Sequence, residues 1–399
     1  MKPADSRVKI DLPSPDIDAS DVLRATEQLG RIITHGTTTS PYKFLLLLAL
    51  LEAIPAVPSV PGTTTPLELK MLGERSLRLL WPQVKPFRAQ ELSRAGMAGH
   101  MDAFRLVAGA QAKEPSLFRF LTRQDLTGSR VSLVNRLTWL LAQWPVPRVQ
   151  TVDRETRTLL WSVPEQWRNR TAGETSNRPV PRSQFDRDEE GNPVLLLYPD
   201  VPELLFRLAP MLRPLIELRF SEVVSRAHRL VLADNDPLAL LPHLFPPPNR
   251  SGTAGRASGV LRHIQDDRCI WCDGAVRGTG HVDHVVAWSR THNDAIENLV
   301  LCDSKCNEKK SDRLPSATLI FKYLEYLDMQ RARLVAGAEG KGLMSDRRAT
   351  LLALHAAILY GPSEAECFDV IEGESVVRTG SRTEWLTLLP HILSSLDQT

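Results

Sequence analysis

Residues 268–312 read RCIWCDGAVRGTGHVDHVVAWSRTHNDAIENLVLCDSKCNEKKSD and hold four of the five cysteines in the 399-residue chain. Acid, imidazole and amide side chains lie between the two cysteine pairs. This mixture in so short a segment favours two separate chemistries, one of metal chelation and one of hydrolysis.

The sulfur atoms predict a structural zinc site. Cys269 and Cys272 form a C-x2-C pair, and Cys302 and Cys306 form a C-x3-C pair after a segment long enough to fold back. Tetrahedral Zn²⁺ takes four thiolate or imidazole ligands, with Zn–S distances of about 2.3 Å. A tight turn that carries two cysteines supplies two of these ligands at little further cost in loop-closure entropy.

One ligand of the predicted site has alternatives. The C-x3-C spacing of the second pair is wider than the common C-x2-C, so His281 or His292 is an alternative to Cys302. The opposing interpretation is that the four thiols are buried separately and never meet.

The segment between the pairs predicts a strand, a loop, a second strand and a helix. Val282–Val286 is a β-branched run, a second strand is predicted over Ile296–Leu301, and a helix opens at Cys306. Neighbouring residues of a regular strand face opposite ways. Asp283 and His284 therefore need a strand end or a bulge to act on one group.

These residues resemble the signature of the HNH endonucleases, a family with a ββα-metal fold. The resemblance covers about fifty residues and rests on Asp283, His284, Asn298 and the ending CNEKK at 306–310, set among two cysteine pairs. A weaker resemblance is the segment SPYKFLLLLALLEAI (40–54), which is similar to the start of many bacterial HNH proteins.

The resemblance implies a role for each residue. His284 is implied to be the general base that activates water, and Asn298 to hold the loop that orients it. Asp283 and Asn307 are implied to bind one catalytic ion, Mg²⁺ or Mn²⁺, at the scissile phosphate. Asn307 stands where many members carry a histidine, which favours a hard, oxygen-seeking ion over zinc. The implied catalytic set is thus His284, Asn298 and Asp283.

Phosphodiester hydrolysis independently suits these residue types. The substrate is negatively charged and repels hydroxide, so it needs a cation and a base that works near neutral pH, as histidine does. Each residue alone has a structural alternative: Asp283 as a turn cap, His284 as a core imidazole, Asn298 and Asn307 as helix caps. Their joint spacing inside a cysteine-paired frame favours the catalytic interpretation.

The charge balance matters through its distribution. Lys plus Arg is 49 and Asp plus Glu is 47, so the total carries no nucleic-acid signal. Basic residues dominate 104–152 and the stretch between Asp236 and Asp266, which suits phosphate contacts, a solvated surface or an ordinary linker. Inside the motif, three side chains are predicted to contact nucleic acid: Lys309, Lys310 and Arg290.

Outside the motif the pattern is mostly helical. Ser40 as cap and Pro41 at the first helical position predict a helix that is apolar on nearly every side and therefore buried. Helices are predicted over Asp21–Ile33, Tyr42–Ile54, Leu67–Leu80, Gln90–Ala108, Val131–Trp144, Leu204–Leu232, Thr318–Val335 and Ser345–Tyr360. Strands are predicted over Thr158–Val163 and Val194–Tyr198.

The predicted fold class is mainly α with a small embedded α+β (ββα-metal) nuclease domain. The predicted parts are a flexible N-terminus (1–17), a helical domain (18–165), a linker (166–193), a helical segment (194–245), a basic Pro/Gly linker (246–262), the HNH domain (263–318) and a helical C-terminal region (319–399).

The predicted function is metal-dependent cleavage of DNA, with a restriction or anti-phage role by analogy. The alternatives are an RNA-cleaving nuclease and an inactive, zinc-stabilised DNA-binding or scaffold module. A partner protein of a defence system or a second copy of the chain is an alternative association. No apolar run is long enough to span a bilayer, and a cytoplasmic location is expected.

Overall fold

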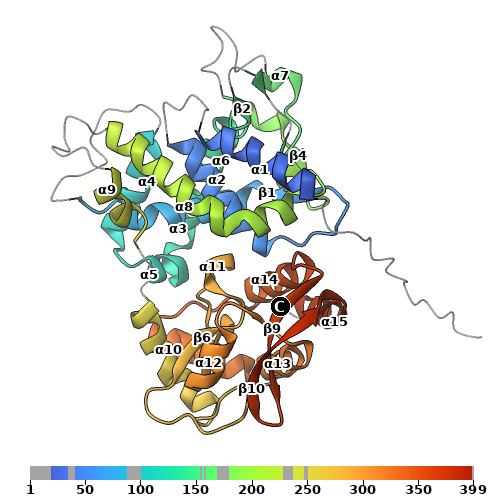
Figure 1. The fold of residues 1–399 in the computed structure, drawn as a ribbon. Coiled ribbons are helices and arrows are strands. Elements are labelled where there is room, and N and C mark those ends of the chain that lie inside the picture. Colours follow the sequence, from blue (N-terminus) through green and yellow to red (C-terminus); the bar gives the residue numbers. More distant parts are fainter. Residues whose placement is uncertain are drawn as a thin grey trace, which may run out of the picture.

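The computed structural model describes residues 19–34, 41–87, 100–152, 155–156, 159–168, 179–227, 237–246 and 250–397. Within these ranges the chain is mainly helical with small sheets, so the predicted fold class is confirmed. Figure 1 shows the elements up to α9 gathered in one half of the molecule and those from α10 onward in the other. No described helix is both long and apolar enough to cross a membrane.

The N-terminal half is built around helix α2 (Tyr42–Ala53). Ten of its 12 residues are buried, as its uniformly apolar sequence predicts. Pro41 is the N-cap residue of this helix. Ser40, which the sequence predicted as the cap of the helix, lies outside the described residues. The surrounding helices are α1 (Ala19–Thr34), α3 (Leu69–Gln83), α4 (His100–Lys113), α5 (Leu117–Thr122), α6 (Thr127–Gln143), α7 (Glu165–Arg168), α8 (Val201–Ala227) and α9 (Pro237–Leu244). Short 3₁₀ turns are η1 (Ile54–Ala56), η3 (Gln124–Leu126) and η5 (Arg182–Gln184).

A small antiparallel sheet borders these helices. The strand predicted over 194–198 is β5 (Pro193–Leu197), which pairs with β1 (Thr65–Glu68) and β4 (Asp186–Arg187). A separate pair joins β2 (Thr151–Val152) to β3 (Glu155–Thr156). Between α7 and β5, residues 169–178 of the predicted linker lie outside the described residues.

The strand predicted over 158–163 is wrong for its described part, residues 159–163. Only Trp161 forms a bridge there, with Leu197. The buried side chain of Gln150 explains the difference, because its Oε1 accepts from the backbone N–H groups of Leu159 and Leu160 and its Nε2 donates to the carbonyl of Trp161. Those backbone groups therefore need no strand partner.

The C-terminal half contains the motif and the elements that pack on it. Its helices are α10 (Arg250–Ile264), α11 (Trp288–Thr291), α12 (Ser304–Lys310), α13 (Ala317–Lys341), α14 (Arg347–Leu359), α15 (Arg382–Leu386) and α16 (Leu389–Leu396), with one 3₁₀ turn, η6 (Ile296–Asn298). Its strands are β6 (His281–His284), β7 (Leu299–Cys302), β8 (Leu314–Pro315), β9 (Glu364–Ile371) and β10 (Glu374–Ser381).

The linker predicted over 246–262 is wrong from residue 250 onward, where α10 begins; residues 247–249 lie outside the described residues. Glycine, serine and arginine suggested a tether, but the small residues let this helix approach α13 closely. Ala257 is buried, and a Cβ placed on Gly337 would lie 2.4 Å from a methyl group of Val260. Tertiary packing therefore overrides the weak helix propensity of the segment.

The C-terminal region is only partly helical, because β9 and β10 form an antiparallel hairpin. Its two-residue turn, Glu372-Gly373, has positive φ at both positions, as a type I′ turn requires. Strand β8, which follows α12, joins the hairpin as a parallel neighbour of β9.

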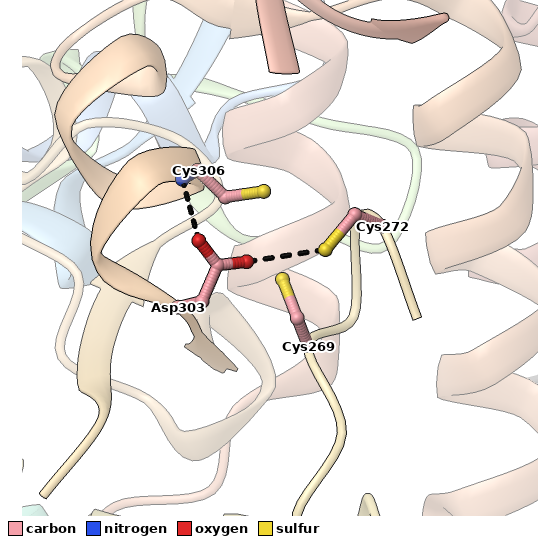
Figure 2. A group of neighbouring side chains, drawn as sticks. All are labelled: Cys269, Cys272, Asp303 and Cys306. Carbon is pink, nitrogen blue, oxygen red and sulfur yellow. Dashed lines mark hydrogen bonds between the residues drawn. The ribbon is translucent and has the colours of Figure 1, made fainter. Parts of the chain in front are cut away.

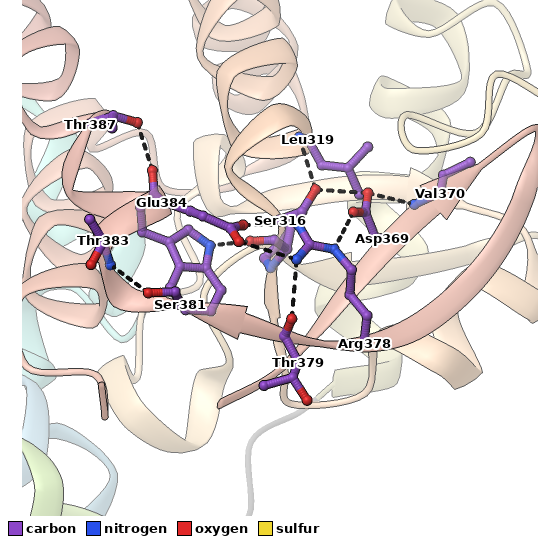
Figure 3. A network of polar contacts seen from close by, with 12 residues as sticks. Ser316, Leu319, Asp369, Val370, Arg378, Thr379, Ser381, Thr383, Glu384 and Thr387 are labelled. Carbon is purple, nitrogen blue, oxygen red and sulfur yellow. Dashed lines mark hydrogen bonds and ion pairs between the residues drawn. The ribbon is translucent and has the colours of Figure 1, made fainter. Parts of the chain in front are cut away.

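A polar network fastens this hairpin to the end of the motif (Figure 3). Ser316 caps α13 by accepting from the amide of Leu319 and donates its hydroxyl to Asp369 of β9, at 2.8 Å. The guanidinium of Arg378 on β10 donates to Asp369 at 2.7 Å and to Glu384 at 3.0 Å. The hairpin, α15 and the start of α13 are thus held as one unit.

The two halves meet along α14 and α11. Helix α14 contacts η1, and α11 contacts α8. The guanidinium of Arg207 on α8 donates to the carbonyl of Tyr360 at 2.9 Å, and the hydroxyl of Tyr360 contacts that of Ser59. The N-terminal half therefore touches α11, which follows β6, the strand that ends at the candidate base His284.

Candidate metal and catalytic site

Strands β6 and β7 form the frame of the site. They pair antiparallel, with Asp283 opposite Val300 and His284 opposite Leu299. Strand β6 ends at His284, so the acid and the imidazole lie at a strand end, as their joint action requires. Strand β7 is buried along its whole length, and helix α12 follows it directly.

The imidazole of His284 is held by a carboxylate. Its Nε2 lies 2.8 Å from Oδ1 of Asp294, and the side chain of His284 is 18% exposed. Sequence reasoning missed Asp294, because acids are common in turn-rich stretches and its distance in sequence from His284 follows no periodicity. A carboxylate on one ring nitrogen fixes the orientation of the imidazole and the position of its proton.

The carboxylate of Asp283 lies beside a buried lysine. Its Oδ2 is 2.9 Å from Nζ of Lys310, whose side chain is 0% exposed. The angle is not that of a hydrogen bond, so Oδ2 is a buried oxygen without a hydrogen-bond partner among the described residues. The ammonium of Lys310 instead donates to the carbonyl of His284 at 2.6 Å, which ties α12 to the end of β6.

Asn298 uses its whole amide to hold the loop after β6. Its Oδ1 accepts from the amide of Val286, and its Nδ2 donates to the carbonyls of Val286 and Asn293, each within 3.0 Å. Val286 comes two residues after His284, and Asn293 comes directly before Asp294. The fully buried Asn298 therefore joins the two segments that carry the histidine and its carboxylate.

Asn307 differs from Asn298 in its surroundings. It lies on α12, which contacts β6, and its side chain is only half-buried. Within the described part of the chain its amide makes no hydrogen bond. An amide oxygen that the protein leaves unpaired suits a ligand of a divalent ion.

Three of the four predicted cysteines come together with an acid (Figure 2). The ligand atoms of Cys269, Cys272, Cys306 and Asp303 all lie within 4.8 Å of one another. Three thiols and one carboxylate around a common point can hold a metal such as zinc.

Asp303 takes the place that the sequence assigned to Cys302. It is the N-cap of α12, where its Oδ1 accepts from the amide of Cys306 at 3.0 Å and its Oδ2 from the thiol of Cys272 at 3.1 Å. Cys302 lies one residue earlier, at the end of β7, and its thiol is directed to the carbonyl of His281. Neither His281 nor His292 belongs to the group. The D-x-x-C spacing of a capped first turn was the signal that could have identified Asp303.

The protonation of this group reflects its hydrogen bonds. The hydrogen bond with Cys306 lowers the pKa of the Cys269 thiol to about 7, whereas burial raises the pKa of Cys272 to about 11. Burial would raise the pKa of Asp303, but the bonds from the Cys306 amide and the Cys272 thiol outweigh it and hold that pKa well below its usual range. Asp303 therefore gives the group a negative charge, whereas the pKa values of Cys272 and Cys306 are both raised.

Gln265, at the end of α10, connects the first cysteine pair to the sheet. Its Oε1 accepts from the amide of Leu301 and its Nε2 donates to the carbonyl of Leu301, both at 2.9 Å. Leu301 also accepts from the amide of Ile270, which lies between Cys269 and Cys272. At Leu301, the backbone groups on the edge of β7 that faces away from β6 are therefore hydrogen-bonded to the side chain of Gln265 and to the turn between Cys269 and Cys272.

The three basic residues predicted to contact nucleic acid differ in accessibility. Lys309 is exposed on α12 and Arg290 is half-buried on α11. Lys310 is fully buried, and its ammonium is engaged by His284 and Asp283. The prediction that Lys310 contacts nucleic acid is therefore wrong; its function in the structure is internal.

Comparison with known families identifies the segment. Residues 276–316 match the sequence model described as HNH endonuclease. The chain carries an HNH segment. No curated protein and no solved structure matches the chain. The HNH segment includes Asp283, His284, Asn298 and Asn307, whereas Cys269 and Cys272 precede it. Two of the four residues of the candidate metal-binding group therefore come from the turn before the HNH segment. The HNH family indicates a nuclease and a nucleic-acid substrate.

Proposed function

We propose that this chain is a metal-dependent endonuclease that hydrolyses phosphodiester bonds in DNA. The observation that carries the proposal is the orientation of His284 by Asp294 at the exact end of β6, inside an HNH segment. A histidine held in this way is placed to take a proton from water near neutral pH.

Asp283 and Asn307 would hold the catalytic ion. The Oδ2 of Asp283 forms an ion pair with Lys310 but no hydrogen bond, and the amide of Asn307 makes no hydrogen bond with the described residues. Both offer oxygen, the ligand atom that Mg²⁺ and Mn²⁺ prefer. When bound, such an ion supplies positive charge to the phosphate and the leaving oxygen. Asp283 is also the acidic partner of the buried ammonium of Lys310, at 2.9 Å.

The remaining residues position these groups. Asn298 holds the backbone on both sides of the His284–Asp294 pair, and the Cys269, Cys272, Asp303 and Cys306 group would hold structural Zn²⁺. That zinc would fix the turn before β6 to the start of α12, which carries Asn307. DNA is favoured over RNA only by analogy with the family, and a restriction or anti-phage role is part of the same proposal.

The test is cleavage of supercoiled plasmid with added Mg²⁺, with wild-type protein, His284→Ala and His281→Ala. His281 is the matched control, since it is an exposed histidine on the same strand. We expect His284→Ala to lower the cleavage rate by roughly 10²–10⁴-fold, the usual contribution of a general base. His281→Ala should cleave like wild type. Equal rates for wild type and His284→Ala would contradict the proposal, and a parallel assay on RNA would decide the substrate.

A further inference from the structure

A cavity of about 520 Å³ lies where the two halves of the molecule meet. One side is formed by α3, α8 and the end of α2, and the other by α11, the loop after it and the start of α14. In Figure 1, α11 projects from the HNH segment toward the N-terminal half at this junction. A cavity of this volume is the usual size of a site for a small ligand.

Two arginines of α3 face this cavity without a partner. Arg75 and Arg78, three residues apart and on one side of the helix, both line it. Neither makes a hydrogen bond or a close ion pair with any residue that the structure describes. Protein surrounds Arg78 so closely that burial lowers the pKa of its guanidinium, yet the side chain remains half-buried because it borders the cavity. A largely surrounded guanidinium without a hydrogen-bond partner is stabilised by an anionic ligand, and its planar set of N–H donors matches the oxygens of a phosphate.

The carboxylates that line the same cavity are already engaged. Arg213 binds Glu52 at 2.7 Å and Glu217 at 3.1 Å. Asp294 is held by His284, and Asp346 caps α14 by accepting from the amide of Ala349. Glu52 and Asp346 attract Arg78 electrostatically but do not bond to it. Each of these four carboxylates therefore has a hydrogen bond or an ion pair inside the protein, whereas Arg75 and Arg78 make neither with the described residues.

Aromatic rings also line the cavity, two of them on the wall formed by the C-terminal half. Trp288 and His292 line the cavity, with ring centroids 4.0 Å apart, and Phe245 lines it from the N-terminal half. Burial lowers the pKa of His292 to about 3, so this ring is neutral at physiological pH. Neutral aromatic surface opposite arginines matches a ligand with a flat ring at one end and a phosphate at the other.

We propose that this cavity binds a free mononucleotide, with its phosphate on Arg75 and Arg78 and its base against Trp288. A cavity of about 520 Å³ accommodates one nucleotide but not a duplex, whose major groove alone is about 12 Å wide. The site lies outside the group of candidate catalytic residues and meets it at Asp294 alone.

Isothermal titration calorimetry without added Mg²⁺ tests the binding. The probes are AMP, GMP, CMP and UMP, with adenosine as the phosphate-free control. At least one monophosphate should bind, and Arg78→Gln should weaken that binding by roughly tenfold or more, the loss expected for a charge-assisted bidentate contact. Arg136→Gln is the matched control, since Arg136 is exposed on α6 and is not among the residues that line the cavity; this variant should bind the nucleotide like wild type.

Three outcomes would overturn the proposal. They are the absence of heat with every monophosphate at millimolar concentration, equal affinity of wild type and Arg78→Gln, and adenosine binding as tightly as AMP. Circular dichroism of Arg78→Gln ensures that a loss of binding is not a loss of fold. Arg75→Gln is the second variant should Arg78→Gln not fold.

The position of Asp294 in the cavity wall adds a consequence that rests on the proposed nuclease function. The bound monophosphate should change the plasmid cleavage rate of wild type and leave the rate of Arg78→Gln unchanged. His284→Ala should still bind the nucleotide with wild-type affinity. Binding without any cleavage activity would therefore refute the nuclease and retain the nucleotide site.

Discussion

Oδ1 of Asp294 lies 2.8 Å from Nε2 of His284, although the two residues are separated by a helical turn and a loop. Two features hold this contact: the bonds of Asn298 to both backbone segments, and the pairing of β6 with β7. The orientation of the candidate base thus depends on a residue in a loop that also faces the N-terminal half.

Replacement of Asp294 tests this orientation. Asp294→Asn keeps the size of the side chain but removes its charge, and the amide can face the imidazole with either its oxygen or its NH2 group, so the position of the imidazole proton is no longer fixed. We expect kcat for plasmid cleavage to fall by about tenfold to a hundredfold, part of the full contribution of a general base, with KM little changed. Asp312→Asn, an exposed acid after α12, is the control. A wild-type kcat in Asp294→Asn would mean that the contact has no catalytic role.

The two asparagines should differ in how much they contribute to the free energy of unfolding. Asn298→Ala leaves three backbone groups without their partner in a buried place, and we expect a loss of about 3 kcal/mol in the free energy of unfolding. Asn307→Ala removes a side chain that makes no hydrogen bond with the described residues and should cost less than about 1 kcal/mol. Urea unfolding measures both.

A Mg²⁺ titration of cleavage by Asn307→Ala and Asp283→Ala separates ligation from stability. Each variant should need more Mg²⁺ for half-maximal cutting, because each lacks a proposed ligand. An unchanged titration in both variants would place the ion elsewhere.

Zinc content tests the cysteine and aspartate group. After dialysis against Mg²⁺ buffer, the protein should retain about one Zn²⁺ per chain, since a thiolate site binds far more tightly than an open oxygen site. Cys306→Ala should lose the metal, whereas Cys302→Ala and Cys367→Ala should keep it, because those thiols lie outside the group. If Cys302→Ala loses the metal but keeps a native circular dichroism spectrum, Cys302 is a zinc ligand and the four-cysteine hypothesis is correct.

The neighbouring lysines of α12 should separate binding from stability. Lys309→Gln removes an exposed charge and should weaken DNA affinity by less than about tenfold, with a smaller salt dependence. Lys310→Met leaves Asp283 without its buried partner and should destabilise the fold by about 3 kcal/mol. If Lys310→Met unfolds at the wild-type urea concentration, the buried pair contributes nothing to stability.

Acid should weaken the network at the hairpin. Burial alone would raise the pKa of Asp369, but the bonds from Arg378 and Ser316 outweigh it and lower this pKa below its ordinary value of 3.8. A lowered carboxyl pKa gives stability that is complete above the ordinary value and is lost as the pH falls toward the folded-state value. Asp369→Asn should therefore melt below wild type at pH 7, and this difference in Tm should shrink below about pH 4. A difference independent of pH would rule out the ionised pair as its origin.

The sequence predicted the motif well where the determinants are local. The β-branched run around His284, the pair spacing and the apolar helix at 42–53 all follow from residues close in the chain. Asp303 was also readable, because an aspartate just before a helix is an N-cap signal, and the cap bond brings its carboxylate to the third helical residue, here Cys306. Asp303 was overlooked because the fourth ligand was assigned to the thiol of Cys302 and a carboxylate was not considered.

The missed features depend on partners distant in sequence. Helix α10 has a linker-like composition and is held by contacts with α13, which no local pattern shows. Lys310 looked like a surface cation beside Lys309, yet its position on α12 turns it inward toward Asp283. The cavity at Arg78 forms only when α3 meets the loop after β6, more than 200 residues later in the chain.

The side chain of Gln265 has a consequence for solubility. A two-stranded sheet leaves each strand with an outer edge of unpaired backbone groups, which another chain can use for intermolecular pairing. At Leu301 both backbone groups are taken by the amide of Gln265, and the cysteine turn covers the same edge. The molecule therefore carries its own protection against edge-to-edge aggregation at the strand next to its candidate nuclease centre, without a third strand to provide it.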